Sequence, residues 1–131
     1  MKTLRTIIIL ILPLALFATD IYYAQAAKKV DKYPSPIGGI DGIAKKIKYP
    51  AKAKKAGIQG KVLIKAVIDE NGNVEFAEVE KGVNPDLDKE ALRAVKETKF
   101  IPGEIKNKKV KTEITVPIKF KLKKDNGTKE T

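Results

Sequence analysis

The chain lacks cysteine, histidine and tryptophan, and Ser35 is its single serine. Without cysteine and histidine it has neither a thiolate nucleophile nor a histidine general base, and the common zinc sites are excluded. Disulfide bonds and cysteine-linked lipids are excluded as well. The carboxylates that could suggest a metal site occupy predicted turn and helix-cap positions: Asp69, Glu70, Asp86 and Asp88. We therefore expect a protein that is not an enzyme, with no catalytic residues, no cofactor and no bound metal.

Arginine is also scarce, although the chain is strongly basic. The net charge is +11, from 27 lysine and arginine residues against 16 acidic ones, and the only arginines are Arg5 and Arg93. The lysines are dispersed and aromatic residues are few, whereas nucleic-acid sites use arginine forks and aromatic stacking. We therefore predict a solvated basic surface without a nucleic-acid partner, which would favour anionic partners electrostatically.

The N-terminal residues have the pattern of an export signal. Lys2 and Arg5 precede an apolar run at 6–18, and Ala24-Gln25-Ala26 is a small-x-small cleavage motif. This pattern predicts a signal peptide at 1–26, with cleavage between Ala26 and Ala27. The alternative is an uncleaved anchor, but the run of about 13 residues is shorter than the ~20 residues of a membrane-spanning helix. Membrane contact is expected only if this segment is retained.

The rest of the chain divides into a linker, one domain and a tail. Residues 27–37 are polar, contain two prolines and are predicted to be a linker. Residues 38–123 form the predicted domain, and residues 124–131 a disordered tail. Short helices are predicted at 38–49, from apolar residues at helical spacing, and at 50–56. A longer helix begins at the Asn84-Pro85 cap and ends before Phe100.

Three strands are predicted in this domain. The strand at 61–69 is apolar on both faces and is followed by an Asn71-Gly72 hairpin turn and a strand at 73–81. In the strand at 110–122 apolar and polar residues alternate strictly, which predicts one packed face. Pro117 lacks an N–H group and therefore places this strand at an edge. The predicted fold is a two-layer α+β sandwich of order α-α-β-β-α-β, in which helices cover a three-stranded antiparallel sheet of order 2-1-3.

Several short motifs, in this order and spacing, resemble the C-terminal domain of TonB-family energy transducers. They are Tyr49-Pro50-x-x-Ala53-x-x-x-Gly57-x-x-Gly60-x-Val62, Ile68-Asp69-x-x-Gly72-x-Val74, Leu87-Asp88-x-x-Ala91, Phe100-x-Pro102-Gly103 and Val116-Pro117-Ile118-x-Phe120. Together they lie within Gly38–Leu122, nearly all of the chain after the signal. The resemblance implies a periplasmic domain of a Gram-negative bacterium with a role in TonB-dependent transmembrane transport.

The resemblance also implies a binding site and a partner. In this family the last strand of the domain captures an extended segment near the N-terminus of an outer-membrane receptor as an additional strand, a mode called β-augmentation. The corresponding residues here are Val110, Lys111, Thr112, Glu113, Ile114, Thr115 and Val116. Because Pro117 has no N–H, docking is expected on this half of the strand. The alternative is a protected edge, since lysines and proline also prevent edge pairing.

Two features of the family's full-length transducers have no counterpart in this sequence. Those proteins carry an uncleaved membrane helix with a serine and a histidine, followed by a long proline-rich spacer. Here the N-terminal apolar run contains neither residue, and the predicted linker of about ten residues reaches ~35 Å at most. We therefore predict a periplasmic protein-binding module for a receptor or another envelope protein, with anchoring in the inner membrane as the alternative if the N-terminal segment is retained. The alternative is a structural or self-associating envelope protein, for example a homodimer, without an energy-transducing role.

Overall fold

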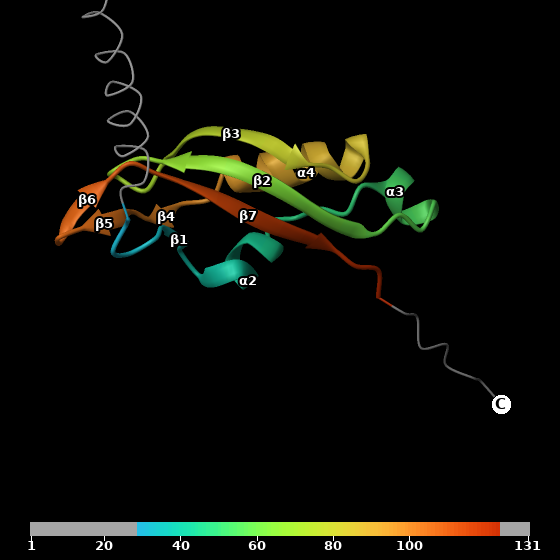
Figure 1. Ribbon diagram of the computed structural model, residues 1–131. Coiled ribbons are helices and arrows are strands. Elements are labelled where there is room, and N and C mark those ends of the chain that lie inside the picture. Colours follow the sequence, from blue (N-terminus) through green and yellow to red (C-terminus); the bar gives the residue numbers. More distant parts are fainter. Residues whose placement is uncertain (1–28, 124–131) are drawn as a thin grey trace, which may run out of the picture.

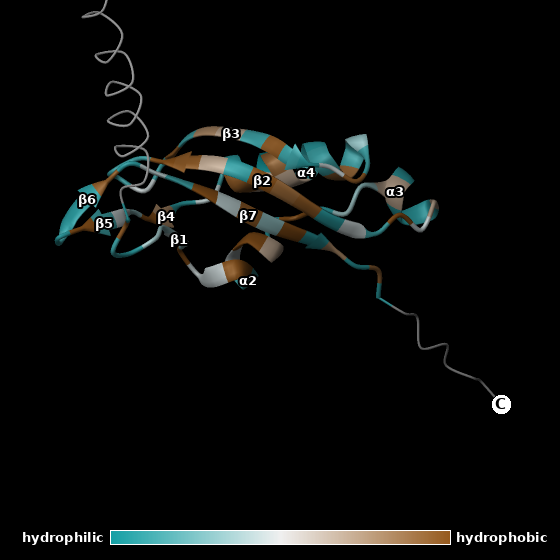
Figure 2. Ribbon diagram, viewed as in Figure 1, coloured by the Kyte–Doolittle hydropathy of each residue, from teal (hydrophilic) through white to brown (hydrophobic). Residues whose placement is uncertain are grey.

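The computed structural model describes residues 29–123, and its centre is a three-stranded antiparallel sheet (Figure 1). The strands are β2 (Gly60–Ile68), β3 (Val74–Lys81) and β7 (Thr112–Phe120), in the order β3-β2-β7. The most apolar strand, β2, is central, as Figure 2 shows. The predicted order 2-1-3 and the antiparallel pairing are confirmed.

Helix α4 (Pro85–Lys96) covers one face of this sheet and completes the core. It begins at Asn84, whose side chain accepts hydrogen bonds from the backbone N–H groups of Asp86 and Leu87. This cap satisfies donors that a helix start otherwise leaves unpaired. The buried side chains of α4 are Leu87, Ala91, Ala94 and Val95, and those opposite them on β2 are Val62, Ile64, Ala66 and Ile68. The two-layer α+β fold class is therefore confirmed.

The two predicted short helices are present but shorter than expected. Helix α2 is Gly39–Ala44 and helix α3 is Ala51–Lys55. The first was predicted to continue to residue 49, but residues 45–48 leave the helix and contact α4 through main-chain groups. Of its apolar stripe, Ile43 is buried whereas Ile40 is 56% exposed.

The last predicted strand is not continuous. Residues 103–110 instead form a small hairpin of β5 (Gly103–Ile105) and β6 (Lys108–Val110). The hairpin turns at Lys106 and Asn107, which both have positive φ angles, as a tight two-residue hairpin loop requires. Strand β7 runs only from Thr112 to Phe120, so the prediction of one strand at 110–122 was wrong in its first two and its last two residues. Alternation along the chain could not reveal this break, since it continues across both strands.

The segment predicted as a linker is partly built into the domain. Ser35–Pro36 forms β1, which pairs with β4 (Phe100–Ile101), and Pro34 is buried. Strands of two residues have no periodicity that a sequence pattern could reveal. The predicted signal peptide at 1–26, its cleavage site at Ala26 and Ala27, and the predicted tail at 124–131 lie outside the described residues. Within 29–123, no helix has the length and apolar character needed to cross a membrane.

Candidate functional site: the outer edge of β7

Strand β7 is a regular outer strand of the sheet. It pairs with β2 in unbroken register from Gly60↔Phe120 to Ile68↔Thr112. The other outer strand, β3, has two register shifts against β2, one near each end. Bulges of this kind disturb the row of edge groups that a further strand would need. Among the described residues, β7 is therefore the sheet edge better suited to accept another strand.

The direction of the main-chain groups on β7 follows from the register. Asp69 donates its backbone N–H to the carbonyl of Asn73 at 2.9 Å, so its main chain faces β3. Because direction alternates along a strand, Leu63, Lys65 and Val67 also face β3. Their register partners on β7 are Pro117, Thr115 and Glu113. These three residues thus direct their main-chain groups to the free edge, where Glu113 and Thr115 offer N–H donors and all three offer carbonyl acceptors.

The side chains of β7 divide between the two faces of the sheet. Thr112 and Val116 are buried and Ile114 is half-buried, whereas Glu113, Thr115 and Pro117 are exposed. On the exposed face, Glu113 forms an ion pair with Lys65 at 3.4 Å, and the Thr115 hydroxyl donates to Glu80 at 3.0 Å. These surface contacts leave the edge-directed main-chain groups available.

Two adjacent hollows border this edge, and we call them together the edge groove. The first has a volume of about 450 Å³ and is lined by Tyr33, Pro34, Pro36, Ile40, Phe100, Glu113, Ile114, Thr115, Val116 and Pro117. The second, of about 380 Å³, is lined by Ile40, Ile43, Ala44, Ile47, Lys61, Pro117, Ile118 and Lys119. Both include Ile40 and Pro117, so they meet midway along β7. Figure 1 shows α2 beside β7, on the side away from β3.

The wall of the groove opposite β7 was not predicted from the sequence. It consists of α2 and of residues 33–36, in which Tyr33 is 65% exposed. Residues 33–36 belong to the predicted linker at 27–37, and Ile40 belongs to the predicted helix at 38–49. The one available signal is Tyr33, an aromatic residue directly before Pro34 in a polar segment, and it does not indicate what the segment packs against.

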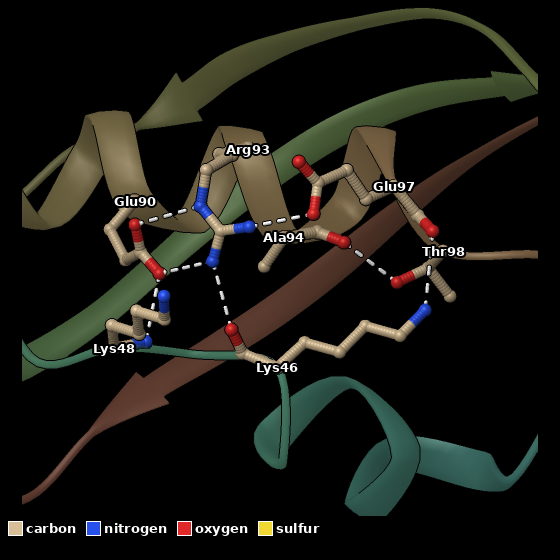
Figure 3. Close-up of polar contacts among 7 residues, drawn as sticks. All are labelled: Lys46, Lys48, Glu90, Arg93, Ala94, Glu97 and Thr98. Carbon is tan, nitrogen blue, oxygen red and sulfur yellow. Dashed lines mark hydrogen bonds and ion pairs between the residues drawn. The ribbon is translucent and has the colours of Figure 1, made fainter.

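A hydrogen-bonded cluster on α4 holds the segment that follows α2 (Figure 3). Arg93 donates to the Lys46 carbonyl at 2.8 Å, and the Lys48 backbone N–H donates to the Glu90 carboxylate at 2.8 Å. Arg93 also binds Glu90 and Glu97. The hydrogen bond from Arg93 lowers the pKa of Glu90 below its ordinary value, and the same contact raises the pKa of Arg93. Because this segment continues α2, the cluster helps to position the groove wall.

The structure separates the seven residues that were predicted to bind a partner. Val110 lies in β6, where it pairs with Gly103, and is therefore not part of the edge strand. Lys111 connects β6 to β7 and forms an ion pair with Glu75 at 2.7 Å, a contact that raises the pKa of Lys111. The other five residues lie on β7, namely Thr112, Glu113, Ile114, Thr115 and Val116. Only Glu113 and Thr115 among them direct main-chain groups outward.

The groove offers main-chain hydrogen bonds beside apolar hollows, which suits an extended peptide with alternating side chains. Within residues 29–123 the structure contains no cluster of three acidic side chains that could hold a metal ion.

The comparisons with known proteins agree with one another. The family model of the Gram-negative bacterial TonB protein C-terminal region matches residues 45–122. Protein TonB of Xanthomonas campestris pv. campestris is 40% identical over 76 residues, which are 57% of this chain and 34% of that protein. Protein TonB of Vibrio cholerae is 36% identical over 76 residues, 57% of this chain and 31% of that protein.

A solved structure shows the same similarity. The NMR solution structure of the Helicobacter pylori TonB C-terminal domain is 29% identical to this chain, with a TM-score of 0.54. The match covers 66% of this chain and 91% of that domain. By contrast, the chain spans only about a third of the length of the curated relatives it matches.

Proposed function

The chain belongs to the TonB C-terminal domain family, and from this premise we propose that it is a periplasmic module that captures an extended protein segment at the edge of β7. The segment is the N-terminal part of an outer-membrane receptor or a part of another envelope protein, and it docks by β-augmentation. In this role the module contributes to TonB-dependent transmembrane transport. TonB-family proteins are envelope-associated proteins that transduce energy or bind outer-membrane receptors, and they are not enzymes.

One observation carries the proposal. The edge of β7 is unbulged, and its free main-chain groups, at Glu113, Thr115 and the Pro117 carbonyl, open onto a groove with apolar walls. Main-chain bonds supply affinity in β-augmentation, and hollows that receive alternate side chains supply specificity. Lysines and proline can protect a strand edge from pairing. Despite Pro117 and the lysines in and around β7, the first half of this edge still offers both backbone N–H donors and carbonyl acceptors.

The test removes a single edge-directed N–H group. Thr115→Pro deletes this donor without removing a hydrogen bond to β2, because Thr115 faces away from β2. The binding of peptides copied from the N-terminal segments of outer-membrane receptors is measured by isothermal titration calorimetry. We expect Thr115→Pro to weaken binding at least about ten-fold, with an unchanged circular dichroism spectrum.

The matched control is Thr115→Val, which also loses the hydrogen bond to Glu80 but keeps the N–H group, and it should bind like the wild type. If Thr115→Pro folds and binds the peptides with unchanged affinity, the β7 edge is not the docking site.

The second candidate is a structural envelope protein that associates with itself through the same edge. A free strand edge with both donors and acceptors can pair with a second copy as well as with a peptide. Light scattering distinguishes the two. A receptor-binding module stays at the mass of one chain and binds the added peptide, whereas a self-associating protein has the mass of a dimer that peptide does not dissociate.

The location follows from the N-terminal pattern and the family. We place the domain in the periplasm, either released by cleavage after Ala26 or held at the inner membrane by residues 1–26. Protease added outside the inner membrane should digest the domain in both cases. Its release into the soluble fraction distinguishes cleavage from retention.

A further inference from the structure

We propose that the edge groove selects its partner by charge at one end: the docked segment carries aspartate or glutamate where it meets Lys61 and Lys119. We call this the lysine end of the groove. The inference rests on the proposed function, since it concerns the same groove, and it adds the chemical class of the captured segment.

The first observation is a pair of like charges. Lys61 on β2 and Lys119 on β7 are direct cross-strand neighbours, and both are exposed. Like charges in this arrangement destabilise a sheet. Among the described residues, neither lysine forms an ion pair with a carboxylate. The pair therefore costs folding stability without compensation inside the domain.

The other lysines of this sheet region provide a contrast. Lys65, four residues after Lys61 on β2, pairs with Glu113 at 3.4 Å, and Lys111 pairs with Glu75 at 2.7 Å. On the exposed face, lysine charges are thus neutralised by carboxylates near the start of β7, whereas the charges of Lys61 and Lys119 near its end are not. This difference confines the excess positive charge to one end of the groove.

The residues around the lysine end add further positive charge. The sequence contains no aspartate or glutamate at 42–68 or at 114–124, whereas eight lysines occur in the first stretch alone. Beyond the end of β7 a further hollow is lined by Gln59, Lys121, Leu122 and Lys123. The Leu122 backbone N–H donates to Gln59 at 2.8 Å, which holds this part of the chain beside the start of β2.

The shape of the lysine end indicates what it would bind. Lys61 and Lys119 line the same hollow of about 380 Å³ as Ile40, Ile43 and Ile47. An apolar side chain can occupy this hollow while a neighbouring carboxylate meets the lysines. Exposed charge pairs contribute modestly and are screened by salt, so this end would select among segments that the main chain of β7 already binds.

The experiment compares peptides that differ only in charge. The probes are short alternating valine–threonine peptides with two glutamates at the N-terminal end or at the C-terminal end, each matched by a peptide with two glutamines. We expect the wild type to bind one of the two glutamate peptides about five-fold more tightly than its glutamine match at low salt. The preferred placement reports the direction of the docked strand.

The double variant Lys61→Gln/Lys119→Gln should bind that pair of peptides equally. Lys65→Gln is the matched control on the same face, and it should keep the preference because Lys65 already has a partner in Glu113. The inference is overturned if the wild type shows no preference with either placement, or if the double variant retains it.

Two further arms separate the possible failures. Thr115→Pro should weaken the glutamate and glutamine peptides alike; if it weakens neither, the proposed function fails together with the inference. The wild type and the double variant are also incubated with vesicles that contain anionic phospholipid. If the lysines bind these vesicles but give no peptide preference, they serve a membrane surface, and the carboxylate inference is wrong.

Discussion

At the scale of single residues, Glu90 shows how one carboxylate can join two parts of the fold. Its side chain is 14% exposed and accepts hydrogen bonds from Arg93 on its own helix and from the Lys48 backbone N–H. The Arg93 contact lowers the pKa of Glu90. The ionised form is therefore favoured in the folded state, so folding stability must depend on pH through this residue.

The expected effect has a definite sign. The stability that ionised Glu90 contributes is present in full above its ordinary pKa of 4.5, and it is lost as the pH falls through the lowered folded-state pKa. Glu90→Gln should cost about 1 kcal/mol near pH 7, and the difference from the wild type should shrink towards pH 3. Urea denaturation at stepped pH values measures this. Glu97→Gln is the control, because the Glu97 side chain is 58% exposed; a constant difference for Glu90→Gln would contradict the assignment.

At the scale of elements, the turn between β2 and β3 does more than reverse the chain. Asp69 accepts backbone hydrogen bonds from Asn71 and Asn73 within the turn. The Gly72 carbonyl accepts the N–H of Phe100 at 2.9 Å, which ties the turn to β4. A Cβ atom on Gly72 would lie 1.9 Å from the Phe100 carbonyl oxygen, and Gly72 has a φ of +80°. Both the backbone angle and the close approach therefore require glycine.

This geometry predicts a large cost for one methyl group. Gly72→Ala should destabilise the domain by about 3 kcal/mol, because it adds a clash with main chain to the strain of a positive φ. Gly57→Ala is the matched control: its φ is +68°, but a Cβ there meets open space, so only about 1 kcal/mol is expected. Urea denaturation compares the two, and equal costs would show that the Phe100 contact does not constrain the turn.

At the scale of the whole molecule, residues 31–37 connect the start of the domain to its C-terminal half. The backbone N–H groups of Asp31 and Lys32 both donate to the Glu104 carbonyl, and Ile37 donates to the Lys99 carbonyl. Lys32 and Glu104 also form an ion pair at 3.5 Å. Since residues 33–36 line the edge groove, this docking completes the groove with a segment that lies far from β7 in the sequence.

Amide hydrogen exchange tests this docking without any mutation. The amides of Lys32 and Ile37 should exchange at least about ten-fold more slowly than unprotected amides of the same sequence. The exposed Glu70 in the β2–β3 turn is the internal reference. Unprotected exchange at both Lys32 and Ile37 would mean that the segment does not dock in solution, and that the wall of the groove at residues 33–36 is absent.

The sheet and α4 were predictable because their signals are local and repeated. The alternation that ends at Phe120, the apolar run of β2 and the Asn84-Pro85 cap each report the environment of several residues in a row. Pro117 even indicated which strand lies at the edge. The break between Val110 and Thr112 was missed because a hairpin and a strand share the same alternation.

The sequence by itself determined the fold class, the strand order, the absence of the usual catalytic and zinc-binding side chains, and the family resemblance that the comparisons confirm. Only the tertiary structure decided where the edge groove lies and what forms its opposite wall. The reason is physical: the wall at residues 33–36 is held by bonds to Lys99, Phe100 and Ile101 and to β5, and the lysine end exists because register places Lys61 beside Lys119. Contacts between residues so distant in the chain leave no periodic pattern in either segment.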